Sequence, residues 1–258
     1  MAISIRLMRT PLPWILPALL AASCLTSGCV SNGQAPRADS PGQETAEWMR
    51  SHFLEGRAVR DALVRGELDD ARTRLTQVAA EAGPVDAPPS WEPRLEAVRT
   101  AAREASEAEG LPQATRAFAQ LATRCADCHS ATGARIEFER LAVPEGETPP
   151  VQMQRHQWAA ERMWEGLIAP DAARYREGAR VLAEAALHPL ELRAGTAPPL
   201  EVVQVAERAR GVAGQASRAE SQADRAALYG ELLTTCAGCH GQLGAREPRA
   251  SVEPSLAP

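Results

Sequence analysis

Two five-residue stretches contain the residue types best suited to chemistry. Residues 125–129 read CADCH and residues 236–240 read CAGCH. Both match C-x-x-C-H, the attachment motif for a c-type haem. Two thiols at this spacing can bond to one porphyrin, and the adjacent His is then held beneath the iron as its proximal ligand. The sequence therefore predicts two covalently bound haem c groups. The residues expected to hold them are Cys125, Cys128, Cys236, Cys239, His129 and His240.

Two other uses of paired cysteines fit these motifs less well. A structural zinc site can use two C-x-x-C pairs, but it does not require a His directly after the second Cys. A thioredoxin-like redox pair is typical of a βαβ context, which the sequence does not show. Only 6 Cys and 5 His occur in 258 residues, so composition rarely produces this motif by chance. Its occurrence twice favours haem attachment.

The composition predicts an all-α protein. The chain is rich in Ala, Arg, Glu and Leu, and it contains only 2 Tyr and 3 Phe. Few β-branched or aromatic runs are present, whereas apolar residues recur at helical spacing. The formal net charge is -5 and no basic block stands out, which argues against nucleic acid as a partner.

Residues 1–28 have the pattern of a secretory signal. Arg6 and Arg9 precede a short apolar stretch that Pro residues interrupt. The stretch ends in LTSGC at residues 25–29, which resembles the processing site of a bacterial lipoprotein. Cys29 is then the acylated residue and the membrane anchor; Cys24 offers a weaker alternative site. We expect a lipid-anchored protein on the periplasmic side of a bacterial membrane; ordinary signal cleavage, which would leave a soluble protein, is the alternative.

The remainder divides into two similar halves. Residues 29–44 form a polar tether, 45–140 a first helical bundle, 141–152 a linker and 153–250 a second bundle. His156 follows His52 by 104 positions, and Cys236 follows Cys125 by 111. Both haem motifs are followed by Gly-Ala-Arg at the same distance. Internal duplication accounts for this pattern, and it predicts two tandem four-helix bundles that each fold alone.

The position of the second motif indicates a family. Only 18 residues follow His240, and none of them is Met or His, so a sixth iron ligand must come from upstream. With C-x-x-C-H near its C-terminal end, each half resembles the class II cytochromes, the cytochrome c′ family and its low-spin relatives. The resemblance implies four-helix bundles whose first helix supplies the residue facing the iron. It covers residues 45–140 and 153–250, although Gly-Ala-Arg replaces the family's aromatic-Arg pair.

Each half offers two candidates for that distal position. His52 and His156 stand at matching places, and Met49 and Met153 precede them by three residues on the same helical face. We expect the two histidines to be the distal ligands; the Met pair or an open, five-coordinate iron are the alternatives. Two arginines follow the haem motifs, Arg135 and Arg246. We expect them to pair with haem propionates; solvated side chains at the helix ends are the alternative.

These features predict a dihaem cytochrome that exchanges electrons with a redox partner protein. A gas-binding or gas-sensing protein of the cytochrome c′ type is the alternative, and it requires an open distal site. An enzyme such as a dihaem peroxidase needs an acid/base constellation near an open iron, and none could be named from the sequence. The expectation is therefore a non-enzymatic electron carrier.

Overall fold

The structure, a computed structural model, describes residues 43–185 and 199–244. Within these ranges the chain forms eight α-helices and one short 3₁₀ turn, with no strand, which confirms the all-α prediction. Among the described helices, none is both long and apolar enough to cross a membrane. The signal segment, most of the tether and Arg246 lie outside the described residues.

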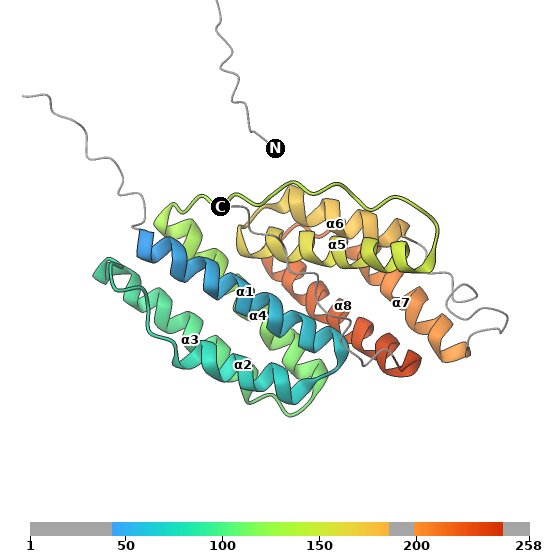
Figure 1. The fold of residues 1–258 in the computed structure, drawn as a ribbon, viewed down its shortest axis with the longest axis horizontal. Coiled ribbons are helices and arrows are strands. Elements are labelled where there is room, and N and C mark those ends of the chain that lie inside the picture. Colours follow the sequence, from blue (N-terminus) through green and yellow to red (C-terminus); the bar gives the residue numbers. More distant parts are fainter. Residues whose placement is uncertain (1–42, 186–198, 245–258) are drawn as a thin grey trace, which may run out of the picture. The chain divides into compact units, whose positions relative to one another are not determined.

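Glycines terminate the first and the fourth helix of the first half. Gly66 ends the first helix with a φ of 76°, and Gly133 ends the fourth with a φ of 68°. This left-handed region is accessible to Gly at little cost, because Gly has no Cβ. The elements are α1 (Gln43–Arg65), α2 (Leu68–Ala80), η1 (Pro89–Trp91), α3 (Glu92–Ser106) and α4 (Leu111–Thr132) (Figure 1).

The second half repeats this series. Its helices are α5 (Pro149–Ile168), α6 (Ala172–Glu184), α7 (Leu200–Ala216) and α8 (Gln222–Leu243). Helix α5 begins inside the predicted linker of residues 141–152, and Pro149 and Pro150 form its first turn. The first turn of a helix tolerates Pro because its N–H groups have no partner within the helix.

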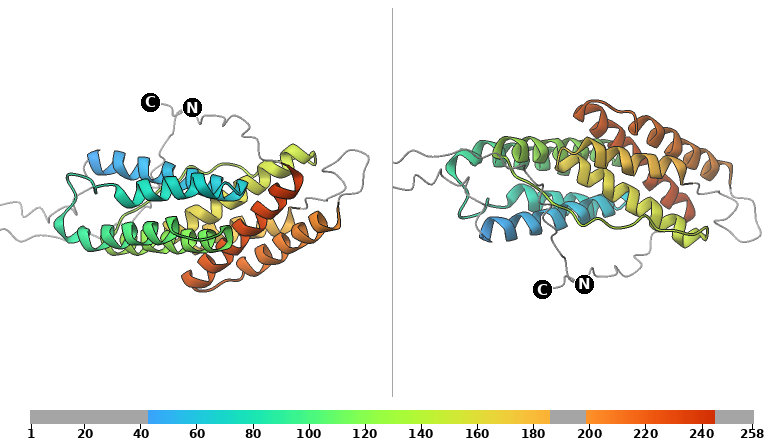
Figure 2. Two further views of the ribbon diagram at one scale, coloured as in Figure 1. Left: turned by 90° about the horizontal axis from the view of Figure 1, so that it is seen from below. Right: turned by 90° about the horizontal axis from the view of Figure 1, so that it is seen from above.

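The two halves share one hydrophobic core. Successive helices pack together within each half, and α8 also packs along α4 and against α1 (Figures 1 and 2). The buried residues of both halves form a single cluster that includes Leu63, Phe118, Met163 and Leu232. Thr115 of α4 and Thr234 of α8 are joined by a hydrogen bond of 2.6 Å. This arrangement differs from the expected pair of self-contained cores.

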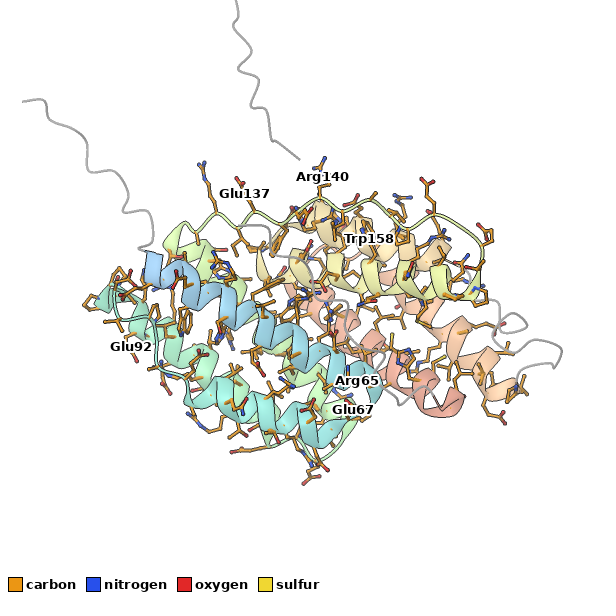
Figure 3. All side chains as sticks on the ribbon, viewed as in Figure 1. Arg65, Glu67, Glu92, Glu137, Arg140 and Trp158 are labelled. Carbon is orange, nitrogen blue, oxygen red and sulfur yellow. The ribbon has the colours of Figure 1, made fainter. Side chains whose placement is uncertain are left out.

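The segment between α4 and α5 is held along its length. Trp158 of α5 donates a hydrogen bond to the carbonyl of Leu141 at 3.2 Å, and Arg155 donates to that of Pro144 at 3.0 Å. Glu137 and Arg140 project from this segment away from the helices (Figure 3). The linker is therefore an extended strap packed on the helices rather than a free spacer.

Candidate haem-binding site

Both C-x-x-C-H motifs lie at the C-terminal ends of long helices. Residues 125–129 are in the last turns of α4, and residues 236–240 occupy the same place in α8. Positions i, i+3 and i+4 of a helix share one face, so each motif presents two thiols and an imidazole on one side. Gly133 and Gly244 end the two helices with the same φ of 68°. Each caps its helix by donating its N–H to the carbonyl of the motif's own His, His129 or His240.

The four motif cysteines are free thiols in the structure. Burial raises the pKa of Cys125 to about 12 and that of Cys236 to about 12. Burial also raises the pKa values of Cys128 and Cys239. All four thiols are therefore protonated near neutral pH.

In the first half, α1 places a second imidazole near the motif. The two rings are close enough for His52 to contribute to lowering the pKa of His129, although burial is the larger cause. Nδ1 of His52 lies 2.9 Å from the carboxylate of Glu81, and its ring stacks on Trp48 with centroids 4.6 Å apart. Nδ1 of His129 lies 2.7 Å from the carbonyl oxygen of Ile168.

The second half has the matching pair, from α5 and α8. Burial lowers the pKa of His156 to about 4, and the nearby His240 contributes to this shift. The Nε2 atom of His156 is buried without a hydrogen-bond partner, while the backbone of Ala185 interacts with the same ring. His240 interacts with the backbone of Val64, which opposes the lowering of its pKa by burial. That contact is looser than the bond from His129, because Nδ1 of His240 has no hydrogen-bond partner of good geometry.

This pattern fits imidazoles that bind iron. A metal-binding His usually donates its other ring N–H to a carboxylate or a backbone carbonyl, which sets the ring orientation. His52 and His129 have such partners at Nδ1, which leaves Nε2 available. The orphaned Nε2 of His156 is costly in a buried site unless a ligand satisfies it. The residues present are therefore compatible with two haem groups, because two thiols and two imidazoles lie near each other in each half.

The remaining predicted residues have less distinctive places. Met49 and Met153 are half-buried on α1 and α5, and Arg135 is exposed just beyond α4. Cys29, Cys24 and Arg246 lie outside the described residues. Across residues 43–185 and 199–244, no three His, Cys, Asp or Glu side chains converge in a way that could hold a metal ion. The two histidine pairs offer two nitrogen ligands each.

Three contacts of the site were not predicted from the sequence. Glu81 accepts from His52, but its counterpart 104 positions later is Ala185, so the repeat gave no signal for it. The carbonyls of Ile168 and Val64 face the motif histidines of the opposite half. A backbone carbonyl is present at every residue, and no residue type marks the one that will be used.

Comparison with known proteins adds no relative. No family model matches the chain, and neither the curated proteins nor the solved structures contain a significant match.

Proposed function

We propose that this protein is a dihaem c-type cytochrome that carries electrons outside the cytoplasm. One observation carries the proposal: each of the two C-x-x-C-H motifs ends a long helix, beside a second imidazole from the first helix of its half. We also propose that α1–α4 and α5–α8 are two four-helix bundles in tandem, of the class II cytochrome type. The packing of successive helices against one another within each half supports this assignment.

The residues have distinct roles in this proposal. Cys125 and Cys128 anchor one haem, and Cys236 and Cys239 anchor the other. His129 and His240 are the proximal ligands. When bound, the haem iron supplies the one-electron chemistry, which no side chain of the site provides by itself. The chain fixes the imidazole positions and excludes water around them.

One further histidine completes each proposed iron site. His52 and His156 are the distal ligands, and Glu81 orients the ring of His52 through Nδ1. Two neutral imidazoles give a lower reduction potential than a His/Met pair, because a Met ligand raises it. Saturated iron also leaves no site for a gas molecule, which favours electron transfer over gas binding.

The proposed location rests on the signal-like segment and the LTSGC sequence near the amino terminus. We propose that Cys29 is acylated and holds the protein on the periplasmic side of a bacterial membrane, where it meets a redox partner protein. Arg135 and Arg246 are proposed to pair with haem propionates, since guanidinium binds carboxylates through two parallel hydrogen bonds.

Covalent haem provides the direct test. The denatured protein should retain haem colour on a gel, with a mass equal to the chain plus two haem groups. The double variant Cys125→Ala/Cys128→Ala should keep only the haem of the second motif. The double variant Cys236→Ala/Cys239→Ala should keep only the haem of the first motif. The reduced wild type should not bind carbon monoxide. A colourless wild type, or one that carries zinc instead, would overturn the proposal.

A further inference from the structure

Three aromatic side chains form a continuous stack between α4, α5 and α8. The rings of Phe118 and Trp164 have centroids 4.8 Å apart and planes inclined by 11°. Trp164 and Tyr229 follow at 6.4 Å and 26°. All three side chains are buried, with exposures of 0%, 3% and 0%. The stack therefore crosses the shared core from the first half to the second.

Each end of the stack leads to a haem motif. Phe118 precedes Cys125 by seven residues on α4, and Tyr229 precedes Cys236 by seven residues on α8. Seven residues are two turns, so each pair lies on one helix face about 10 Å apart along the axis. The Cys236 side chain is also near enough to contribute to the raised pKa of Tyr229, of which burial is the largest cause.

The central ring of the stack, Trp164, has no aromatic counterpart in the first half. The position equivalent to Trp164 in the first half is Arg60, 104 residues earlier, so the repeat does not require a ring here. Gly56 of α1 makes room for it, because a Cβ on that residue would lie 3.1 Å from the indole. The buried Nε1 of Trp164 has no hydrogen-bond partner. A buried Trp usually satisfies this N–H, so the position is occupied at a cost.

We propose that Phe118, Trp164 and Tyr229 are the bridge through which an electron passes between the two haem sites. This inference rests on the proposed function. One haem iron is oxidised and the other is reduced by the same electron, with no proton or other group transferred. The rings are not oxidised themselves. They fill the intervening space with contiguous π-systems, and a gap there weakens the electronic coupling between donor and acceptor.

The test uses the full-length protein with both haems attached and half of its iron reduced. Two-dimensional exchange NMR of the haem methyl groups measures the rate at which the electron moves between the haems within one molecule. Trp164→Leu should slow this exchange several-fold, because Leu leaves a gap between Phe118 and Tyr229. Trp164→Phe keeps a ring and should retain most of the rate.

A matched control comes from the same helix. Trp158 of α5 bonds to the strap through Nε1 and lies outside the stack, so Trp158→Leu should leave the exchange rate unchanged. Phe118→Leu is the second test variant, should Trp164→Leu fail to fold. Both potentials and the low-spin spectra should be retained in each test variant, which separates a loss of coupling from a loss of structure.

The outcomes separate this inference from the proposed function. If the wild type carries two haems and Trp164→Leu has the same exchange rate as the wild type, the bridge is overturned and the cytochrome proposal stands. If Trp164→Leu does not fold, Phe118→Leu decides in the same way. A wild type without two covalent haems overturns both. Slower exchange in the ring-deleted variants at unchanged potentials supports the bridge.

Discussion

Nδ1 of His129 lies 2.7 Å from the carbonyl oxygen of Ile168, although the two residues belong to different halves of the repeat. Ile168 is the last residue of α5, and its equivalent in α1, 104 positions earlier, is Val64. The backbone of Val64 in turn faces His240. The first helix of each half thus lies beside the motif histidine of the other half, and for His129 it supplies a hydrogen-bond partner.

These contacts between the halves predict that neither half folds stably by itself. A protein ending near Pro144 should lose the partner of His129 and expose the part of the core that α5 and α8 cover. We expect it to aggregate, or to show a broad, weakly cooperative thermal transition, even with its haem attached. Circular dichroism melting and size-exclusion chromatography measure this. A soluble, monomeric first half with a sharp transition would show that the shared core is dispensable.

The distal histidines should control the spin state. His52→Ala and His156→Ala should each convert one haem from low spin to high spin and open it to carbon monoxide, because each removes one of the two imidazoles proposed to bind that iron. Electronic and electron paramagnetic resonance spectra report the change. Met49→Leu and Met153→Leu are the matched controls and should remain low-spin. High-spin iron at both sites of the wild type would instead favour the gas-binding alternative.

A buried ion pair joins α1 to α5 and should be a strong contributor to stability. Arg60 is only 2% exposed and pairs with Glu161 and, at 2.7 Å, with Asp61. Burial lowers the pKa of Arg60, but the two carboxylates raise it by more, so the guanidinium stays charged. Glu161→Ala leaves the buried guanidinium with Asp61 as its remaining partner, so it should cost about 3 kcal/mol of unfolding free energy, the lower end of the range for a broken buried pair.

Urea unfolding provides the measurement and an exposed pair provides the control. Arg180 and Glu184 pair at 3.2 Å on α6 with side chains 61% and 62% exposed. Glu184→Ala should therefore change the unfolding free energy by less than about 1 kcal/mol. Replacing Arg60 and Glu161 together by Met should recover much of the loss, since the buried guanidinium is removed and the groups that lose a partner, Arg57 and Asp61, are partly exposed. Equal effects of Glu161→Ala and Glu184→Ala would contradict this prediction.

The anchor should depend on a single cysteine. Wild-type protein should partition into the detergent phase, and Cys29→Ala should yield a soluble or unprocessed form, because this thiol is the proposed attachment site of the acyl chains. Phase separation followed by mass spectrometry of the N-terminal peptide measures both outcomes. Cys24→Ala is the control and should behave as wild type. Detergent partitioning of processed Cys29→Ala protein would assign the anchor to another residue.

The sequence by itself determined the features that depend on neighbours along the chain. The two C-x-x-C-H motifs carry their chemistry within five residues, and their helical setting follows from apolar spacing and from glycines such as Gly66 and Gly133. The all-α class could be predicted because apolar residues recur at helical spacing, and the repeat marked His52 and His156 as residues at equivalent positions.

Only the tertiary structure decided how the halves meet. An apolar helix face shows that a residue is buried, but it does not say whether the partner lies in the same half or in the other. The merged core, the stack of Phe118, Trp164 and Tyr229, and the bond between His129 and Ile168 all depend on that choice. Contacts within one half and contacts between halves use the same side-chain chemistry, so only the three-dimensional arrangement distinguishes them.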